Sequence, residues 1–239
     1  MSSAVAPLAA LLLTLMYLAP QALAQSVAKT TLHYDLRRAG LTLGQLRLTH
    51  QQDARAYVAE GRFRTTGLVA ALRQVRFDMH VSGRVGDTEM QPGRYREQIR
   101  TGRRSSSVTL HYVGGRPHLI SGQAGTAHGA DPAKQAGTLD PMTALWLAAT
   151  GHACDRTLPI FDGARRTLLQ LGPLRETANG PGCQGELHRL DGYAPADLAR
   201  HPAFALSLWF QTTPNGLRLS RGQVQTTHGP VVLHLSSAR

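Results

Sequence analysis

Apolar and polar side chains alternate along most of the chain, in short runs that end at turns containing glycine or proline. In the clearest run, Val75, Phe77, Met79 and Val81 share one parity, and the run ends at Ser82-Gly83. Because successive side chains of a strand point to opposite faces, this alternation predicts antiparallel strands with one buried face. Similar runs lie at 32–36, 41–48, 57–64, 108–112, 206–210, 217–219 and 231–235. The pattern predicts a mainly β protein, namely a curved antiparallel sheet, half-barrel or barrel of roughly ten strands.

Two segments break the alternation and predict short helices. Asp140 precedes Pro141 and an apolar run that stops at Gly151, the order expected of an N-cap, a first helical residue and a helix end. Residues 144–149 are apolar on every side, so this helix is expected to be buried, either as a fixed plug or as the lining of a cavity. The second candidate covers 66–72, and both helices are expected against the concave face of the sheet.

The N-terminal segment predicts export. Residues 1–24 carry no charged side chain and contain an apolar stretch, Pro20 and the triplet Ala22-Leu23-Ala24, which suits a signal peptidase cutting before Gln25. No later segment is long and apolar enough to span a bilayer, so no transmembrane segment is expected in the mature chain. We expect a periplasmic protein with a cleavable signal peptide at 1–24 and a single β-rich domain at 25–239. Residues 121–138, rich in Gly and Ala and without periodicity, predict a flexible loop in that domain.

Export changes how the cysteines are interpreted. Cys154 and Cys183 are the two cysteines of the chain, and a lone pair in an oxidising compartment normally forms a disulfide bond. The alternative is a reactive or metal-binding thiol that uses His152, but a His-x-Cys pair without further ligands is a weak metal motif. We therefore expect a structural disulfide.

Charge narrows the choice of partners. The formal net charge is +11, from 26 Lys and Arg against 15 Asp and Glu, and Lys29 and Lys134 are the two lysines. An exported basic protein does not normally meet nucleic acid, so the acidic partners to consider are phospholipid headgroups, lipopolysaccharide phosphates and acidic glycans. The simpler explanation of the positive net charge is an arginine-rich composition that serves no acidic partner.

One arginine cluster stands out from the general basic composition. If residues 94–104 form a strand, their even-numbered arginines lie on one face and form a ladder. Arg62 and Arg64 repeat this arrangement on either side of Phe63. Such a ladder is either a solvated outer face or a contact for anionic envelope surfaces. The ladder consists of Arg94, Arg96, Arg100 and Arg104.

Motifs for catalysis are absent. The sequence has no Gly-x-Ser-x-Gly nucleophile elbow, no His-Glu-x-x-His zinc motif and no glycine-rich phosphate loop. We therefore expect no catalytic residue, no cofactor and no metal ligand, although a Ser-His-Asp triad assembled only in space is not visible in a sequence. For a lipid or other hydrophobic small molecule, the candidate cavity residues are Phe77, Leu145 and Trp146.

Several segments resemble one family of exported Gram-negative proteins. Residues 154–166, with the block Phe161-Asp162-Gly163-Ala164-Arg165-Arg166, and the Asp140-Pro-Met-Thr-Ala-Leu helix resemble domain-of-unknown-function family 3108, as do Thr66-Gly67-Leu68 and 90–95. The resemblance implies a periplasmic β-rich barrel or half-barrel, similar to lipid-handling carriers, with no established activity and so no catalytic residues to transfer.

Three functional hypotheses follow. The first is a non-enzymatic periplasmic protein that binds a lipid-like ligand or supports envelope maintenance. The second is an interaction protein that docks on anionic envelope surfaces through the arginine-rich strand. The third is a hydrolase with a triad hidden from sequence analysis. An interior void would favour the first over the second, and a nucleophile within hydrogen-bond reach of a base would favour the third.

Overall fold

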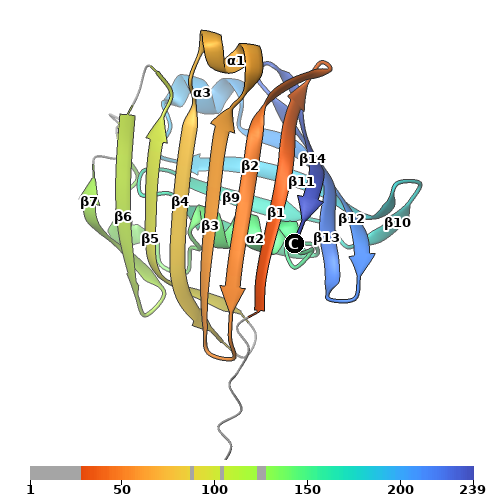
Figure 1. The fold of residues 1–239 in the computed structure, drawn as a ribbon. Helices are drawn as coiled ribbons and strands as arrows, with labels where there is room; N and C mark the ends of the chain where they lie inside the picture. Colours follow the sequence, from red (N-terminus) through yellow and green to blue (C-terminus); the bar gives the residue numbers. More distant parts are fainter. Residues whose placement is uncertain (1–27, 87–88, 103–104, 123–127) are drawn as a thin grey trace, which may run out of the picture.

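The computed structural model describes residues 28–86, 89–102, 105–122 and 128–239 (Figure 1). The predicted signal peptide at 1–24 lies outside the described residues. The strands are β1 (Ala28–Arg38), β2 (Leu41–Gln52), β3 (Ala56–Thr65), β4 (Arg76–Val85), β5 (Met90–Arg100), β6 (Ser105–Val113), β7 (Arg116–Gly122), β8 (Arg156–Phe161), β9 (Arg166–Leu171), β10 (Arg175–Thr177), β11 (Gly180–Asp191), β12 (Ala203–Thr213), β13 (Gly216–Thr226) and β14 (Gly229–Ala238). The helices are α1 (Gly67–Leu72), α2 (Pro141–Ala149), α3 (Pro195–Arg200) and a 3₁₀ turn, η1 (Pro132–Lys134).

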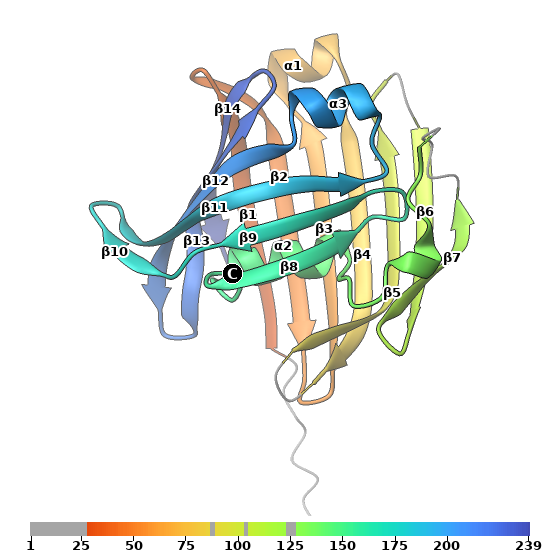
Figure 2. The same ribbon diagram turned by 180° about the vertical axis from the view of Figure 1, so that it is seen from behind.

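All the strands belong to one fourteen-stranded antiparallel sheet. Its order is β7-β6-β5-β4-β3-β2-β1-β14-β13-β12-β11-β9-β8, with β10 paired to β11, so the first and last strands lie side by side at its centre. The sheet curls until its two halves face each other, with β7 and β8 as edges (Figures 1 and 2). This confirms the predicted curved antiparallel half-barrel. The chain has more strands than the roughly ten predicted, in part because β10 has only three residues and β11 shows no regular alternation of apolar and polar side chains.

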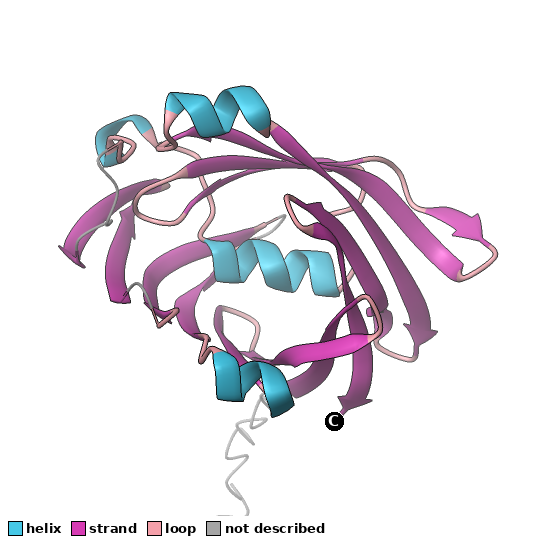
Figure 3. Ribbon diagram, turned by 90° about the horizontal axis from the view of Figure 1, so that it is seen from above, coloured by secondary structure: helices cyan, strands magenta, loops and turns pink. Residues whose placement is uncertain are grey.

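Helix α2 lies inside the curl, as seen from above in Figure 3. The inward side chains of β1–β6 pack beneath it, and Tyr34, Tyr57 and Tyr95 are among the largest fully buried groups. Asp140 caps the helix as predicted, since its Oδ1 accepts hydrogen bonds from the backbone N–H groups of Met142 and Thr143. The sheet also makes room for the helix at Gly61, where a Cβ atom would lie 2.8 Å from Met142 Sδ.

Helix α1 forms where the sequence predicts it, but it is not buried. Leu68 is 83% exposed and Leu72 is 90% exposed, and no residue of the helix is buried. The expectation that both apolar helices lie against the concave face is therefore wrong for α1. The physical reason is its position, because α1 is the short connection between β3 and β4 and sits at one end of the sheet (Figure 1).

The segment predicted as a flexible loop is ordered over most of its described length. Ser121 and Gly122 end β7, residues 123–127 lie outside the described residues, and Ala130, Gln135 and Thr138 are buried. Two backbone hydrogen bonds join Leu139 to the edge strand β8: Leu139 N–H donates to the carbonyl of Pro159, and Phe161 N–H donates to that of Leu139. Residues 128–139 thus cover the edge of the sheet rather than forming a free loop. No helix in the described residues is long and apolar enough to cross a membrane.

Candidate functional site

A cavity of about 410 Å³ lies between α2 and the concave face of the C-terminal strands. Its walls are largely aliphatic, because the inward parity of β9, β11, β12, β13 and β14 is occupied by leucine and valine. The wall leucines are Leu169, Leu187, Leu206, Leu208, Leu219 and Leu233. The volume falls within the range of about 300–1,000 Å³ that is typical of small-molecule pockets.

One stripe of α2 forms the floor of this cavity. Pro141, Ala144, Leu145 and Ala148 line it, and their spacing of three and four residues places them on one face of a helix. Leu145 therefore lies where the sequence analysis expects a cavity residue. Ala144 and Ala148 leave space that larger side chains would fill.

The opposite stripe of α2 is packed against the sheet. Trp146 is 7% exposed and stacks on His50, with ring centroids 4.2 Å apart and an interplanar angle of 5°. Phe77 lies against Phe63, with ring centroids 5.8 Å apart. Neither Trp146 nor Phe77 lines this cavity, although the sequence analysis expects both beside Leu145 in a ligand cavity. Helix α2 is thus packed on one side and lines a cavity on the other.

Charged groups gather at one end of the cavity. Glu97 lines it and accepts a hydrogen bond of 2.7 Å from the hydroxyl of the buried Tyr95. Asp162 Oδ1 accepts from the backbone N–H groups of Ala164 and Arg165, which fixes the tight β8–β9 turn. The Arg165 guanidinium lies over the ring of Tyr193, 5.4 Å from its centroid. The cavity therefore has an aliphatic body and a polar end.

A fully buried polar network supports the start of α2. The Thr143 hydroxyl donates to Asp140 Oδ2 at 2.6 Å and lies 2.8 Å from the Tyr57 hydroxyl, which is therefore the donor in that contact. Burial raises the pKa of Asp140 to about 6, although its hydrogen bonds from Thr143 and Met142 act in the opposite direction. Because these groups satisfy one another and cap a helix, their role is structural.

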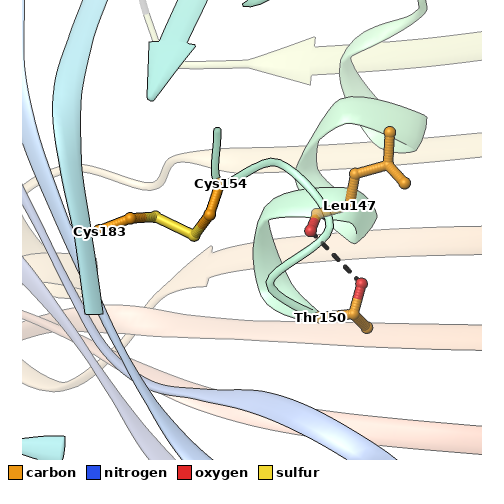
Figure 4. The surroundings of a disulfide bond; sticks show 4 residues. All are labelled: Leu147, Thr150, Cys154 and Cys183. Atoms are coloured by element: carbon orange, nitrogen blue, oxygen red, sulfur yellow. Dashed lines mark hydrogen bonds between the residues drawn. A yellow bond between two sulfur atoms is a disulfide. The ribbon is translucent and has the colours of Figure 1, made fainter. Parts of the chain in front are cut away.

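A disulfide bond between Cys154 and Cys183 fixes the far end of α2, with the two Cα atoms 5.9 Å apart (Figure 4). Cys154 follows the turn that ends α2, and Cys183 belongs to β11. Inside that turn, the Thr150 hydroxyl donates to the carbonyls of Trp146 and Leu147. The helix is therefore attached to the sheet at both ends, through Leu139 on β8 and through the disulfide.

The arginines of the predicted ladder lie on the convex face. Arg94, Arg96 and Arg100 of β5 are exposed, whereas Tyr95 on the other parity is buried. Arg62 and Arg64 are exposed on β3, where Arg62 pairs with Glu60 at 3.3 Å. Arg104 lies outside the described residues. None of these described arginines lines the apolar cavity, so the arginine surface and the cavity are separate features.

Several cavity residues escape sequence analysis. The alternation places Leu206 and Leu208 on the buried face, but it does not reveal that the opposing α2 carries small alanines there. The polar end is also missed, since Glu97, Asp162 and Arg165 line one cavity only because the β8–β9 turn packs against β6, the neighbour of β5. That packing is visible at Gly163, where a Cβ atom would lie 2.5 Å from a Val108 methyl group. In the part of the chain that the structure describes, no group of His, Cys, Asp and Glu is arranged to hold a metal ion.

Comparison with known proteins identifies a family and a fold. The family described as "Protein of unknown function (DUF3108)" matches residues 30–178. The structure resembles a β-barrel-like protein of DUF1849 from Brucella abortus, with a TM-score of 0.54 and 14% identity over 90% of this chain and 98% of that chain. A DUF1329 family protein from Desulfovibrio piger matches at a TM-score of 0.25 and 10% identity, covering 90% and 86% of the two chains. No curated protein matches the chain.

Proposed function

The chain belongs to the DUF3108 family of proteins of unknown function, and from its geometry we propose that it is a non-enzymatic binding protein whose cavity holds one lipid-like molecule. The observation that carries this proposal is the aliphatic cavity of about 410 Å³ beside α2. When an apolar ligand replaces water in a leucine-lined cavity of this size, the free energy of the system falls.

The attachment of α2 supports binding rather than simple packing. Both ends of the helix are held, by residue 139 on β8 and by the disulfide to β11, so the helix does not collapse into the space beside it. The stripe facing that space carries Ala144 and Ala148, where larger side chains would close it. A surface packed only for stability would carry larger side chains here, because they would bury more of the apolar wall.

The periplasm is the compartment that we propose for this activity. The apolar segment at 1–24 has the composition of a signal peptide. A disulfide between Cys154 and Cys183 is typical of an oxidising compartment. A lipid-like ligand in that compartment makes envelope maintenance the process that this proposal favours.

Gly222 offers a direct way to fill the cavity. It lies in the wall, its φ is not positive, and an added Cβ would sit 3.5 Å from Leu208 and 3.7 Å from Leu219, which is ordinary contact. Gly222→Leu therefore places a side chain in the cavity without backbone strain. Gln225→Leu is the matched control, because it adds a leucine to the exposed face of the same strand.

The test uses residues 25–239, which contain every described element, produced in an oxidising compartment. A fluorescent fatty acid should bind the unsubstituted protein and Gln225→Leu alike, and binding to Gly222→Leu should weaken at least roughly tenfold, as expected when ligand and side chain compete for one small pocket. Native mass spectrometry with lipid extraction should identify the natural ligand. Equal binding by all three proteins, or no binding by any, would contradict the proposal.

A further inference from the structure

Three of the most exposed apolar side chains lie at one end of the molecule. Leu68 and Leu72 of α1 are 83% and 90% exposed, and Leu41 at the β1–β2 turn is 65% exposed. The two segments are adjacent, because the Thr66 N–H donates to the carbonyl of Leu43. Figure 1 shows α1 and the β1–β2 turn at this same end. Exposed apolar side chains that gather in one patch mark an interaction site.

A row of arginines crosses the convex face directly below α1. Arg64 of β3 pairs in register with Arg76 of β4, and Arg76 pairs with Arg100 of β5. All three are exposed. Like charges placed directly opposite one another on a sheet repel. An anion lying against the row would offset this repulsion.

Few carboxylates offset this charge. Among the described residues, Asp78 pairs with Arg76 and Asp35 pairs with Arg37, while no ion pair involves Arg64 or Arg100. Arg38 ends β1 and Arg73 follows α1, and both are exposed at the same end. The Arg73 guanidinium donates to the carbonyl of Thr101, which ties the segment after α1 to the end of β5. The exposed leucines are thus bordered by cations.

We propose that this end of the molecule docks on an anionic phospholipid bilayer. Leu41, Leu68 and Leu72 enter the boundary between headgroups and acyl chains, and the row Arg64–Arg76–Arg100 contacts the lipid phosphates. Exposed leucines next to a cationic border are the combination by which peripheral helices bind anionic membranes. A protein partner would bury the leucines equally well, but it would not by itself explain the row of mutually repelling arginines beside them. This surface is separate from the cavity, so the inference stands or falls independently of ligand binding.

The proposed orientation is end-on, which differs from docking through the whole arginine strand. Arg94 and Arg96 lie on β5 six and four residues before Arg100, which places them roughly 20 and 13 Å from it at about 3.3 Å per residue. These distances exceed the Debye length of about 10 Å at 0.1 M salt. Removing Arg94 and Arg96 therefore provides a control with the same change in charge.

The experiment is cosedimentation of residues 25–239 with vesicles of phosphatidylcholine, with and without 30% phosphatidylglycerol. Binding should require the anionic lipid and weaken as salt rises from about 0.1 to 0.5 M. Leu68→Ser/Leu72→Ser and Arg64→Gln/Arg100→Gln should each weaken binding roughly tenfold or more. Arg94→Gln/Arg96→Gln should bind like the unsubstituted protein. Because no residue of α1 is buried, the α1 variant should keep its thermal unfolding transition.

Three results would overturn end-on docking. The first is no binding to anionic vesicles by the unsubstituted protein. The second is an equal loss in the Arg94→Gln/Arg96→Gln control, which would assign binding to the strand face. The third is self-association that disappears in Leu68→Ser/Leu72→Ser without any vesicle binding, which would assign the leucines to a second copy of the chain.

Discussion

His50 is buried and stacks on Trp146, and its Nε2 has no hydrogen-bond partner among the described residues. Burial lowers the pKa of His50 to about 4, whereas burial raises the pKa of Asp140 to about 6. The folded state therefore binds fewer protons at His50 and more at Asp140 than the unfolded chain does. Acidification removes the stability associated with neutral His50, and over nearly the same range it adds stability at Asp140.

His50→Phe should separate these two opposing effects. The variant keeps an aromatic ring against Trp146 but does not titrate, so its stability relative to the unsubstituted protein should grow by about 3 kcal/mol as pH falls from 7 to 4. The sign follows from His50, whose lowered pKa favours the fold above about 6.5 and loses that contribution toward about pH 4. Urea unfolding at a series of pH values measures the difference. A difference that stays constant with pH would show that His50 does not titrate as its burial requires.

Parity along β2 gives the direction of the His50 side chain, but it does not give its contact with Trp146. His50 shares the parity of Leu46 and Leu48, which indicates the inward face of β2. Its contact with Trp146 depends on where α2 crosses the sheet, and alternation along one strand contains no information about that crossing. For the same reason, the pattern along the chain does not show that Leu145 faces the cavity whereas Trp146 packs on the sheet.

Helix α2 packs on the sheet with one face and lines the cavity with the other. Trp146 packs on the sheet, so Trp146→Ala should lower the free energy of unfolding by about 3–5 kcal/mol. Leu145 faces the cavity, so Leu145→Ala should lower it by less than about 2 kcal/mol and change fatty-acid binding instead. Urea unfolding and probe titration on both variants measure the two effects. A larger stability loss for Leu145→Ala than for Trp146→Ala would reverse the assignment of the two faces.

The disulfide is the second determinant of where α2 lies. The bond joins residues 29 positions apart, and closing such a loop in the unfolded chain stabilises the fold by about 3–4 kcal/mol. The double variant Cys154→Ser/Cys183→Ser should lose about this much stability, measured by urea unfolding. Thiol titration of the unfolded, unreduced protein serves as the companion measurement. Two free thiols in that titration would contradict the bond itself.

Capping chemistry made α2 predictable in position and burial, since Asp140, Pro141 and an apolar run form an unambiguous start. The apolar run at 66–72 predicts α1 without a capping signal, but it does not predict the environment of the helix, because a short apolar run suits a buried helix and an exposed one alike. The described part of the segment predicted as a flexible loop, residues 128–139, shows a different limit of sequence patterns. Its glycines and alanines resemble a free loop, yet buried Gln135 and Thr138 and the Leu139 pairing hold it on the edge of β8.

Across the whole molecule, alternation predicts the antiparallel curved sheet, but it does not predict how the sheet curls around α2. The strands follow one another almost in chain order, and the pairing of β1 with β14 joins the first and last described strands. This curvature decides which leucines have no packing neighbour and therefore line the cavity. The cavity is therefore a property of the assembled sheet and α2 together, and short-range patterns do not contain it.

A cavity that belongs to the whole fold should link ligand binding to global stability. Ligand at about 100 times its Kd stabilises a folded protein by about 2.7 kcal/mol. For a domain of this size, about 2–4 °C per kcal/mol then gives a rise in Tm of roughly 5–10 °C. Residues 25–239 should be unfolded in guanidinium chloride with the disulfide intact, refolded without lipid and titrated with palmitate.

The matched variants make this measurement specific. Gln225→Leu should show the same rise in Tm as the unsubstituted protein, because its leucine lies on the exposed face of β13. Gly222→Leu should start from a similar or higher Tm, since its side chain fills the void, and should gain little from palmitate. A rise in Tm that persists in Gly222→Leu would place the ligand elsewhere on the molecule. If none of the three proteins gains stability from palmitate, the cavity does not bind a fatty acyl chain.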